Sequence, residues 1–125
     1  MAKAIVELSD WARTQSELRE LGRRLDAGEE LPEADYRLGF ANAVQLFSEL
    51  TPKRLATLDA LKRIGPVSIY ALAKHLERNY SNVHADIGKL LEHGLVEKTP
   101  EGKVWVPWEE IQIRVTLGGE YREKP

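Results

Sequence analysis

The sequence has no cysteine among its 125 residues. Without thiols the chain can form neither a disulfide framework nor a thiolate metal site, which fits a reducing compartment. It also has no apolar run long enough to cross a membrane, and its first residues lack the charged-then-apolar pattern of a secretion signal. These absences predict a soluble, cytoplasmic protein with no membrane partner.

Sequence motifs of enzymes are absent as well. The chain has no phosphate-binding glycine loop, no nucleophile paired with a base and no carboxylate pair in a known motif. A zinc site is not expected, because there is no cysteine and no two histidines are three or four residues apart. His84 and His93 are nine residues apart, which places them on opposite sides of a helix. We predict that the protein is not an enzyme and has no cofactor.

The charge is distributed unevenly along the chain. Residues 1–50 carry six lysines and arginines against ten aspartates and glutamates, whereas residues 51–108 carry nine against six and hold all three histidines. Residues 109–125 carry three against four. The net charge of −2 therefore hides a modest basic excess in the middle of the chain. A nucleic-acid surface and an ordinary solvated surface both account for an excess of this size.

The first fifty residues predict two strands and two helices. The β-branched stretch 2–8 is typical of a strand, and a helix over 9–27 follows it. An acidic linker over 26–35 leads to a second strand over 35–40, where apolar and polar residues alternate. A short helix over 43–50 completes this part of the chain.

The helix over 9–27 is amphipathic. Ser9 can cap it, and Trp11, Leu18, Leu21 and Leu25 recur at helical spacing. The same stripe is close to heptad spacing, which allows pairing with a helix of a second chain. Because the pattern lasts only two heptads, we expect the stripe to pack against the chain's own core instead.

Three further helices and a hairpin are predicted after residue 50. Thr51 with Pro52 at the first helical position is a strong helix start, because the missing N–H of proline costs nothing there. Ser68 is a second candidate cap, and Asn42 is a third for the short helix before Thr51. The predicted elements are helices over 52–64, 67–76 and 80–93, a hairpin with strands over 95–98 and 103–106, and a half-buried strand over 109–117.

The order of helix, short helix, turn, helix and hairpin is that of a winged helix-turn-helix. The segment SIYALAKHLERNYSNVHADIGKLLEHGLVEK resembles the core of MarR-like predicted transcriptional regulators. The flanking stretches DYRLGF, LTPKRLATLDAL and VPWEEIQIRVTL resemble a family of small bacterial and archaeal winged-helix regulators. Some members of that family are thought to be antitoxins encoded beside a toxin (TumA-like). The resemblance covers about residues 35–117.

We therefore predict an α+β protein with a winged helix-turn-helix domain over residues 51–108. An N-terminal extension over 1–50 precedes this domain, and a C-terminal strand and tail over 109–125 follow it. Many helix-turn-helix units have glycine at the start of the turn, where this chain has Glu77. Asn79 close by tolerates a left-handed conformation, so we expect the turn to form.

The resemblance implies a DNA-binding surface around residue 80. In helix-turn-helix proteins the second helix lies in the major groove and its N-terminal residues meet base edges. Asn82 can pair bidentately with adenine, Ser81 can contact several bases, and Tyr80 or His84 can reach a base or a phosphate. The predicted DNA-binding residues are Lys53, Arg54, Arg78, Asn79, Tyr80, Ser81, Asn82, His84 and Lys89, with Lys98 and Lys103 in the wing.

Each of these residues also has a purely structural interpretation. Taken alone, Ser81 is better explained as a helix cap, and for Asn82 capping and base readout are equally compatible. Tyr80 can pack against the preceding helix as readily as it can contact DNA. Lys53 and Arg54 can belong to a solvated helix face. DNA binding is favoured because these residues share one predicted surface.

We predict a sequence-specific DNA-binding transcriptional regulator, a repressor that can act on its own operon. One recognition helix with a single lysine attracts DNA weakly, so we expect a homodimer that reads two half-sites of double-stranded DNA. Our hypothesis for its interface is a mixed sheet between the two chains, formed by strands at 3–8, 36–40 and 109–117. The alternative is a winged helix that binds a protein, such as an antitoxin that neutralises its toxin, with the acidic segment 29–35 facing a basic partner.

Overall fold

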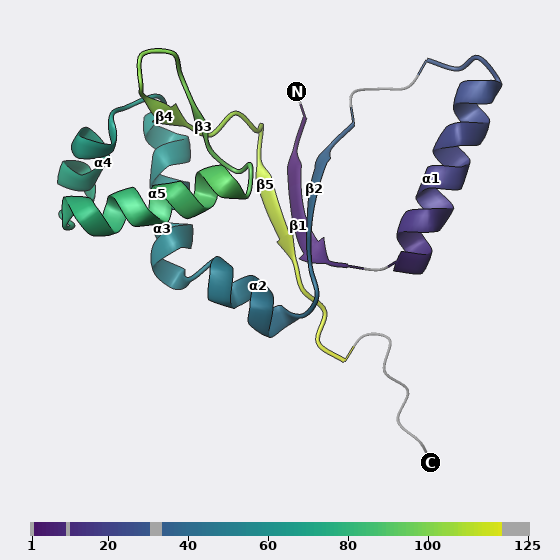
Figure 1. The fold of residues 1–125 in the computed structure, drawn as a ribbon, viewed down its shortest axis with the longest axis horizontal. Helices are drawn as coiled ribbons and strands as arrows, with labels where there is room; N and C mark the ends of the chain where they lie inside the picture. Colours follow the sequence, from purple (N-terminus) through teal and green to yellow (C-terminus); the bar gives the residue numbers. More distant parts are fainter. Residues whose placement is uncertain (1, 10, 31–33, 119–125) are drawn as a thin grey trace. The chain divides into compact units, whose positions relative to one another are not determined.

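The computed structural model describes residues 2–9, 11–30 and 34–118 (Figure 1). The described residues hold five helices and five strands, which confirms the α+β class. The chain divides into two compact units, residues 1–46 with 110–125 and residues 47–109. None of the helices in the described ranges is both long and apolar enough to cross a membrane.

A three-stranded parallel sheet forms the centre of the first unit. β1 (Ala4–Leu8) lies between β2 (Tyr36–Phe40) and β5 (Ile111–Arg114) (Figure 1). Parallel neighbours need long crossover connections. Helix α1 (Trp11–Asp26) lies in the first crossover, and the whole second unit lies between β2 and β5 along the chain. All three strands were predicted, but they pair inside one chain and all in parallel, so both edges of β1 are occupied.

The two faces of this sheet differ in polarity. The register places apolar and aromatic residues together on one face: Ala4, Val6, Leu8, Tyr36, Leu38, Phe40, Ile111 and Ile113. The other face holds Ile5, Glu7, Arg37, Gly39, Gln112 and Arg114. On that face the buried Glu7 carboxylate accepts hydrogen bonds from Arg13 of α1 at 2.9 Å and from Arg37 at 2.8 Å. The start of α1 is therefore tied to the polar face.

The apolar stripe of α1 is exposed. Leu18, Leu21 and Leu25 are 59%, 40% and 55% exposed. The prediction that these leucines pack against the chain's own core is therefore wrong. The polarity of the sheet explains the difference, because on the face to which α1 is tied only Ile5 has an apolar side chain.

Three of the predicted helix caps are confirmed. The side chains of Asn42, Thr51 and Ser68 each accept a hydrogen bond from the N–H three residues further on, at 2.8, 3.2 and 3.1 Å. Each bond satisfies one of the N–H groups that a helix start leaves without an internal partner. The helices are α2 (Ala43–Glu49), α3 (Pro52–Ile64), α4 (Ile69–Leu76) and α5 (Tyr80–Glu92). The buried core of the second unit includes Leu50, before α3, and the inward side chains of α3 to α5: Leu58, Leu61, Leu72, Val83, Ile87 and Leu90.

A short hairpin follows α5. β3 (Glu97–Lys98) pairs antiparallel with β4 (Val104–Trp105), which confirms the predicted hairpin with shorter strands. Val67, in the segment between α3 and α4, exchanges two backbone hydrogen bonds with Val104, of 3.1 and 2.8 Å. This bridge was missed from the sequence. The Trp108 indole N–H donates to the Gly94 carbonyl at 3.0 Å, so the chain is also fixed at the base of the hairpin.

Glu77 itself adopts the left-handed conformation in the turn between α4 and α5. Its φ and ψ are 54° and 44°, and it is the only described residue other than glycine with a positive φ. Asn79, which we expected to relieve the turn, has an ordinary φ of −59°, so that part of the prediction is wrong. The N–H groups of Glu77 and Arg78 bond to the carbonyls of Lys74 and Ala73, the pattern of a Schellman motif.

We expect Glu77→Gly to stabilise the protein. A side chain with a Cβ costs about 1 kcal/mol or more in the left-handed region, and the larger chain entropy of unfolded glycine offsets part of this gain. The free energy of unfolding in urea, followed by circular dichroism, should rise by up to about 1 kcal/mol. Gly94 occupies the same position after α5 with φ 76°, so Gly94→Ala should lower it instead. A loss of stability in Glu77→Gly would contradict this account of the turn.

Candidate nucleic-acid interface

Asn79 caps the N-terminus of α5. Its side-chain Oδ1 accepts hydrogen bonds from the backbone N–H of Ser81 at 2.8 Å and of Asn82 at 3.3 Å. The interpretation of Ser81 as the cap is therefore wrong, because Ser81 is one of the two residues that Asn79 caps. The side chains of Ser81 and Asn82 are exposed. Asn82 is therefore not the cap of α5, and its side chain is accessible from solvent.

An exposed aromatic cluster extends from the first turn of α5 onto α4. The Tyr80 ring centroid lies 6.5 Å from that of Tyr70 on α4 and 5.7 Å from that of His84. The Lys74 ammonium lies 5.6 Å from the Tyr70 ring centroid, within cation–π distance. Tyr80 packs against the preceding helix and is nevertheless accessible. Sequence reasoning missed Tyr70 and Lys74, although their spacing places both on one side of α4.

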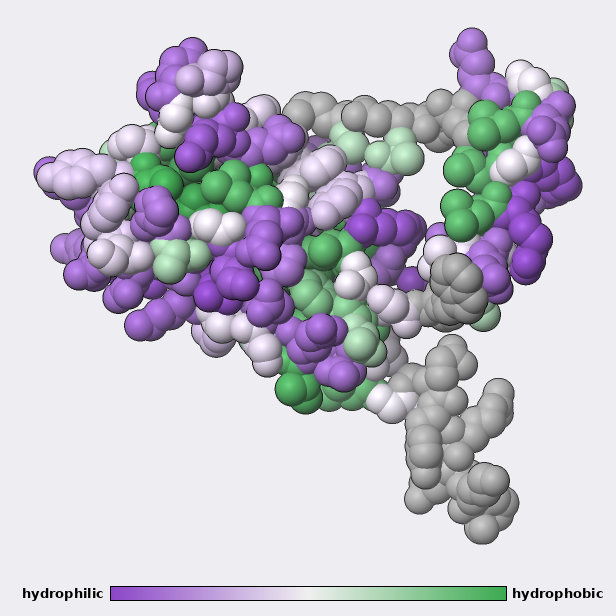
Figure 2. Space-filling model, viewed as in Figure 1, coloured by the Kyte–Doolittle hydropathy of each residue, from purple (hydrophilic) through white to green (hydrophobic). Residues whose placement is uncertain are grey.

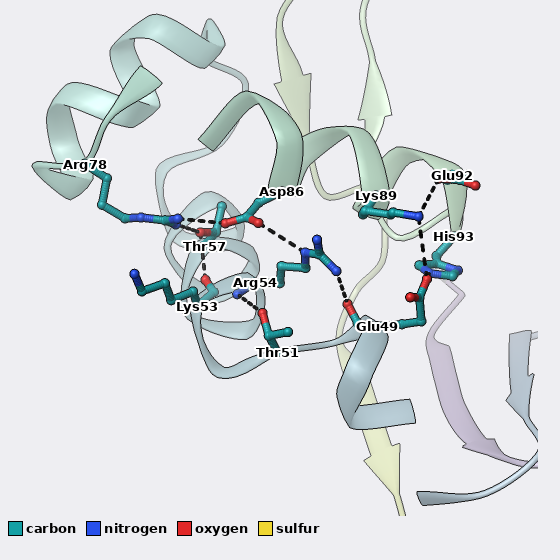
Figure 3. A network of polar contacts seen from close by, with 10 residues as sticks. All are labelled: Glu49, Thr51, Lys53, Arg54, Thr57, Arg78, Asp86, Lys89, Glu92 and His93. Atoms are coloured by element: carbon teal, nitrogen blue, oxygen red, sulfur yellow. Dashed lines mark hydrogen bonds and ion pairs between the residues drawn. The ribbon is translucent and has the colours of Figure 1, made fainter. Parts of the chain in front are cut away.

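Asp86, in the middle of α5, binds two arginines (Figure 3). Its Oδ1 accepts from the Arg54 Nε of α3 at 3.1 Å, and its Oδ2 accepts from the Arg78 Nη2 in the turn at 2.8 Å. Arg54 also donates to the Glu49 carbonyl at 3.0 Å, and Arg78 donates to the buried Thr57 hydroxyl at 2.9 Å. This network, the Asp86 network below, joins α5 to α3, to the end of α2 and to the turn before α5.

The structure uses Arg54 and Arg78 inside the fold, although both were predicted to contact phosphates. Their side chains are only 19% and 21% exposed, and both guanidinium groups are bound within the Asp86 network. Lys53, which precedes Arg54 on α3, is exposed, and in Figure 3 its ammonium end lies clear of the dashed contacts. Of the basic residues predicted on α3, Lys53 is the one available to a ligand.

Lys89 lies toward the other end of α5, beside two carboxylates. Its Nζ is 4.0 Å from Glu49 and 3.7 Å from Glu92. The His93 Nε2 lies 3.0 Å from the same Glu49 oxygen. The hydrogen bond from His93 lowers the pKa of Glu49, and the nearby charges of Lys89 and Arg54 act in the same direction. These carboxylates reduce the attraction that Lys89 can exert on a phosphate.

The hairpin carries the remaining predicted contacts. Lys98 and Lys103 are exposed on either side of its loop, and Glu101 is exposed within the loop. The Thr99 N–H donates to the Lys103 carbonyl at 2.7 Å, which closes the loop. Hydrophilic residues gather over the hairpin in the space-filling view (Figure 2). The hairpin can therefore place two ammonium groups against an anion.

Within the part of the chain that the structure describes, no three of its histidine, aspartate and glutamate side chains are grouped so as to hold a metal ion. His84 belongs to the aromatic cluster and His93 pairs with Glu49. His84, in α5, and His93, which follows the end of that helix, thus have separate surroundings.

The match to a known family spans the same region as these side chains. The sequence model of the HVO_A0114 family matches residues 49–113, more than half of the chain. The chain belongs to this family. No curated protein and no solved structure matches the chain.

Asp86→Ala should destabilise the protein by about 3 kcal/mol, because it leaves two largely buried arginines without their shared carboxylate. Thermal or urea unfolding measures the loss. Asp59→Ala is the matched control, since Asp59 pairs with Arg63 on the surface of α3, where the two side chains are 64% and 74% exposed. An exposed pair of this kind contributes less than about 1 kcal/mol. Equal losses in the two variants would rule out a special role for the Asp86 network.

In acid, the free energy of unfolding of the Glu49→Gln variant should depend less on pH than that of the wild type. Because its pKa is lowered in the folded state, Glu49 contributes stability above its unfolded pKa, and that stability is lost as the pH falls through the folded pKa. The wild type should therefore exceed Glu49→Gln in free energy of unfolding at neutral pH. The difference should shrink as the pH falls from about 5 to about 3. Glu101→Gln, in the exposed loop, serves as the control, and a difference that is constant with pH would contradict the prediction.

Proposed function

We propose that residues 51–108 form a winged helix-turn-helix that binds double-stranded DNA, and that the protein is a sequence-specific transcriptional regulator. The observation that carries this proposal is the exposed first turn of α5. Ser81, Asn82 and His84 are exposed, while Asn79 supplies the cap. Asn82 can read adenine in the major groove by two hydrogen bonds. The name of the HVO_A0114 family states no function, so the family match does not itself argue for DNA binding.

The second unit carries moderate positive charge on its surface. Lys53, Lys74, Lys98 and Lys103 are exposed, and none of the ion pairs found among the described residues involves them. If each neutralises one phosphate, the logarithm of the binding constant falls with the logarithm of salt concentration with a slope of about −4 per protomer. So small a slope for one copy favours a homodimer that reads two half-sites.

The proposal is tested by titrating the full chain onto DNA from directly upstream of its own gene, at several salt concentrations. Scrambled DNA of equal length is the reference. Asn82→Ala should lower affinity for the specific site by about 5- to 100-fold and leave binding to scrambled DNA unchanged. Lys53→Ala should weaken binding to both and reduce the salt slope by about one per protomer.

Lys62→Ala is the matched control for Lys53→Ala. It removes the same charge from the same helix, but its position nine residues further along places it on the opposite side of α3. It should leave the salt slope unchanged. Weak binding by the wild type that ignores DNA sequence would overturn the proposal. A protein partner, such as a toxin, would then be the function to test.

A further inference from the structure

The exposed leucines of α1 form a continuous apolar stripe on a helix whose other residues are mostly polar. Leu18, Leu21 and Leu25 lie on one side of the helix, and hydrophobic residues line one side of α1 in the space-filling view (Figure 2). Three leucines aligned in this way are rarely left in water on a soluble protein. The polar face of the sheet to which α1 is tied cannot cover them.

The stripe has the spacing of a coiled-coil seam. Leu18 and Leu25 are seven residues apart, and Leu21 lies between them at the complementary heptad position. Gly22 lies beside the seam and has open space around its missing Cβ, so nothing in the described chain requires a glycine at this costly position inside a helix. A close helix neighbour would account for it.

Charged residues flank the seam, and they favour a second copy of α1 in the antiparallel orientation. In an antiparallel pair of identical helices, Leu18 of one copy packs on Leu21 of the other, and this contact occurs twice by symmetry. The same register sets Glu17 against Arg24 of the second copy, also twice. In a parallel pair Glu17 would face Gly22, and Arg24 would face Glu29, which follows the end of α1. Only the antiparallel register sets both Glu17 and Arg24 against an opposite charge.

We propose that α1 is a homodimerisation surface that pairs with α1 of a second copy in an antiparallel coiled coil. Glu17 is exposed and Arg24 is half-exposed, and they already pair with Arg13 at 3.7 Å and Glu29 at 3.3 Å. The crossed pairs would therefore extend two existing ion pairs into networks. The interface replaces the strand-to-strand contact expected from the sequence. This proposal takes from the proposed function only the expectation of a homodimer. It can be tested without DNA.

Sedimentation equilibrium of the full chain tests the pairing. The wild type should dimerise with a dissociation constant in the micromolar range, because the seam is short. Leu18→Glu should weaken dimerisation by about tenfold or more, since it places a carboxylate in the seam. Ser16→Glu introduces the same side chain on the opposite side of α1 and should leave dimerisation unchanged. Circular dichroism and urea unfolding of both variants show whether each chain is folded.

Charge reversal tests the direction. Glu17→Arg alone and Arg24→Glu alone should each weaken dimerisation, and the double variant should recover most of the loss, because the crossed pairs are restored with opposite sign. A parallel coil or a dimer formed by another surface predicts no recovery. A wild type that is monomeric throughout the micromolar range would overturn the proposal, whatever the result of the DNA titration.

Cysteine cross-linking gives a second readout, since the chain has no cysteine of its own. The antiparallel register brings residue 14 of one copy against residue 25 of the other. Thr14→Cys with Leu25→Cys should therefore form a disulfide-linked dimer under mild oxidation. Leu25→Cys alone should not, because the two copies of residue 25 would lie about 16 Å apart along the coil. Cross-linking by Leu25→Cys alone would show a parallel pair and contradict the proposal.

Discussion

The carboxylate of Asp86 is the group on which the second unit depends. A charge with so little exposure is tolerated only when it is paired and hydrogen-bonded, and each of its oxygens receives one arginine. Arg54 extends the network to the end of α2 and Arg78 extends it to α3 through Thr57. One side chain of α5 thus fixes that helix against three other segments. A helix held from its buried side in this way presents its opposite side at a constant orientation, as recognition of a rigid ligand requires.

This use of the arginines limits the surface. Arg54 and Arg78 could each bind a phosphate by two hydrogen bonds, but both are already bound inside the fold. Lysines are available on the surface instead, and a lysine binds phosphate as a point charge. Lys89 is further offset by Glu49 and Glu92. A surface of this kind attracts a polyanion moderately, so hydrogen bonds from the first turn of α5 would supply most of the discrimination between sequences.

The local structure could be predicted from the sequence. The partners in long-range contacts could not. Thr51 with Pro52 and Ser68 determined helix starts because capping acts within three residues. Arg54 and Asp86 are 32 residues apart, so their pairing follows only from the packing of α3 on α5. One signal was available: Asp86 lies in the apolar stripe that includes Val83, Ile87 and Leu90, and a charge there requires a buried partner. The leucines of α1 are a similar case. Their spacing predicted an apolar face, but it did not show which surface covers that face.

The topology connects the two units at both ends. Because β1 has a parallel neighbour on each edge, the chain leaves the sheet after β2, forms the second unit, and returns to pair as β5. Residues 47–109 are therefore anchored to one sheet by two covalent connections, and β5 can complete the sheet only after the second unit has been traversed. A pairing of two first units would then bring two second units together in one assembly, each held at both ends. The proposed dimerisation through α1 and the proposed reading of two half-sites would both depend on this one topology.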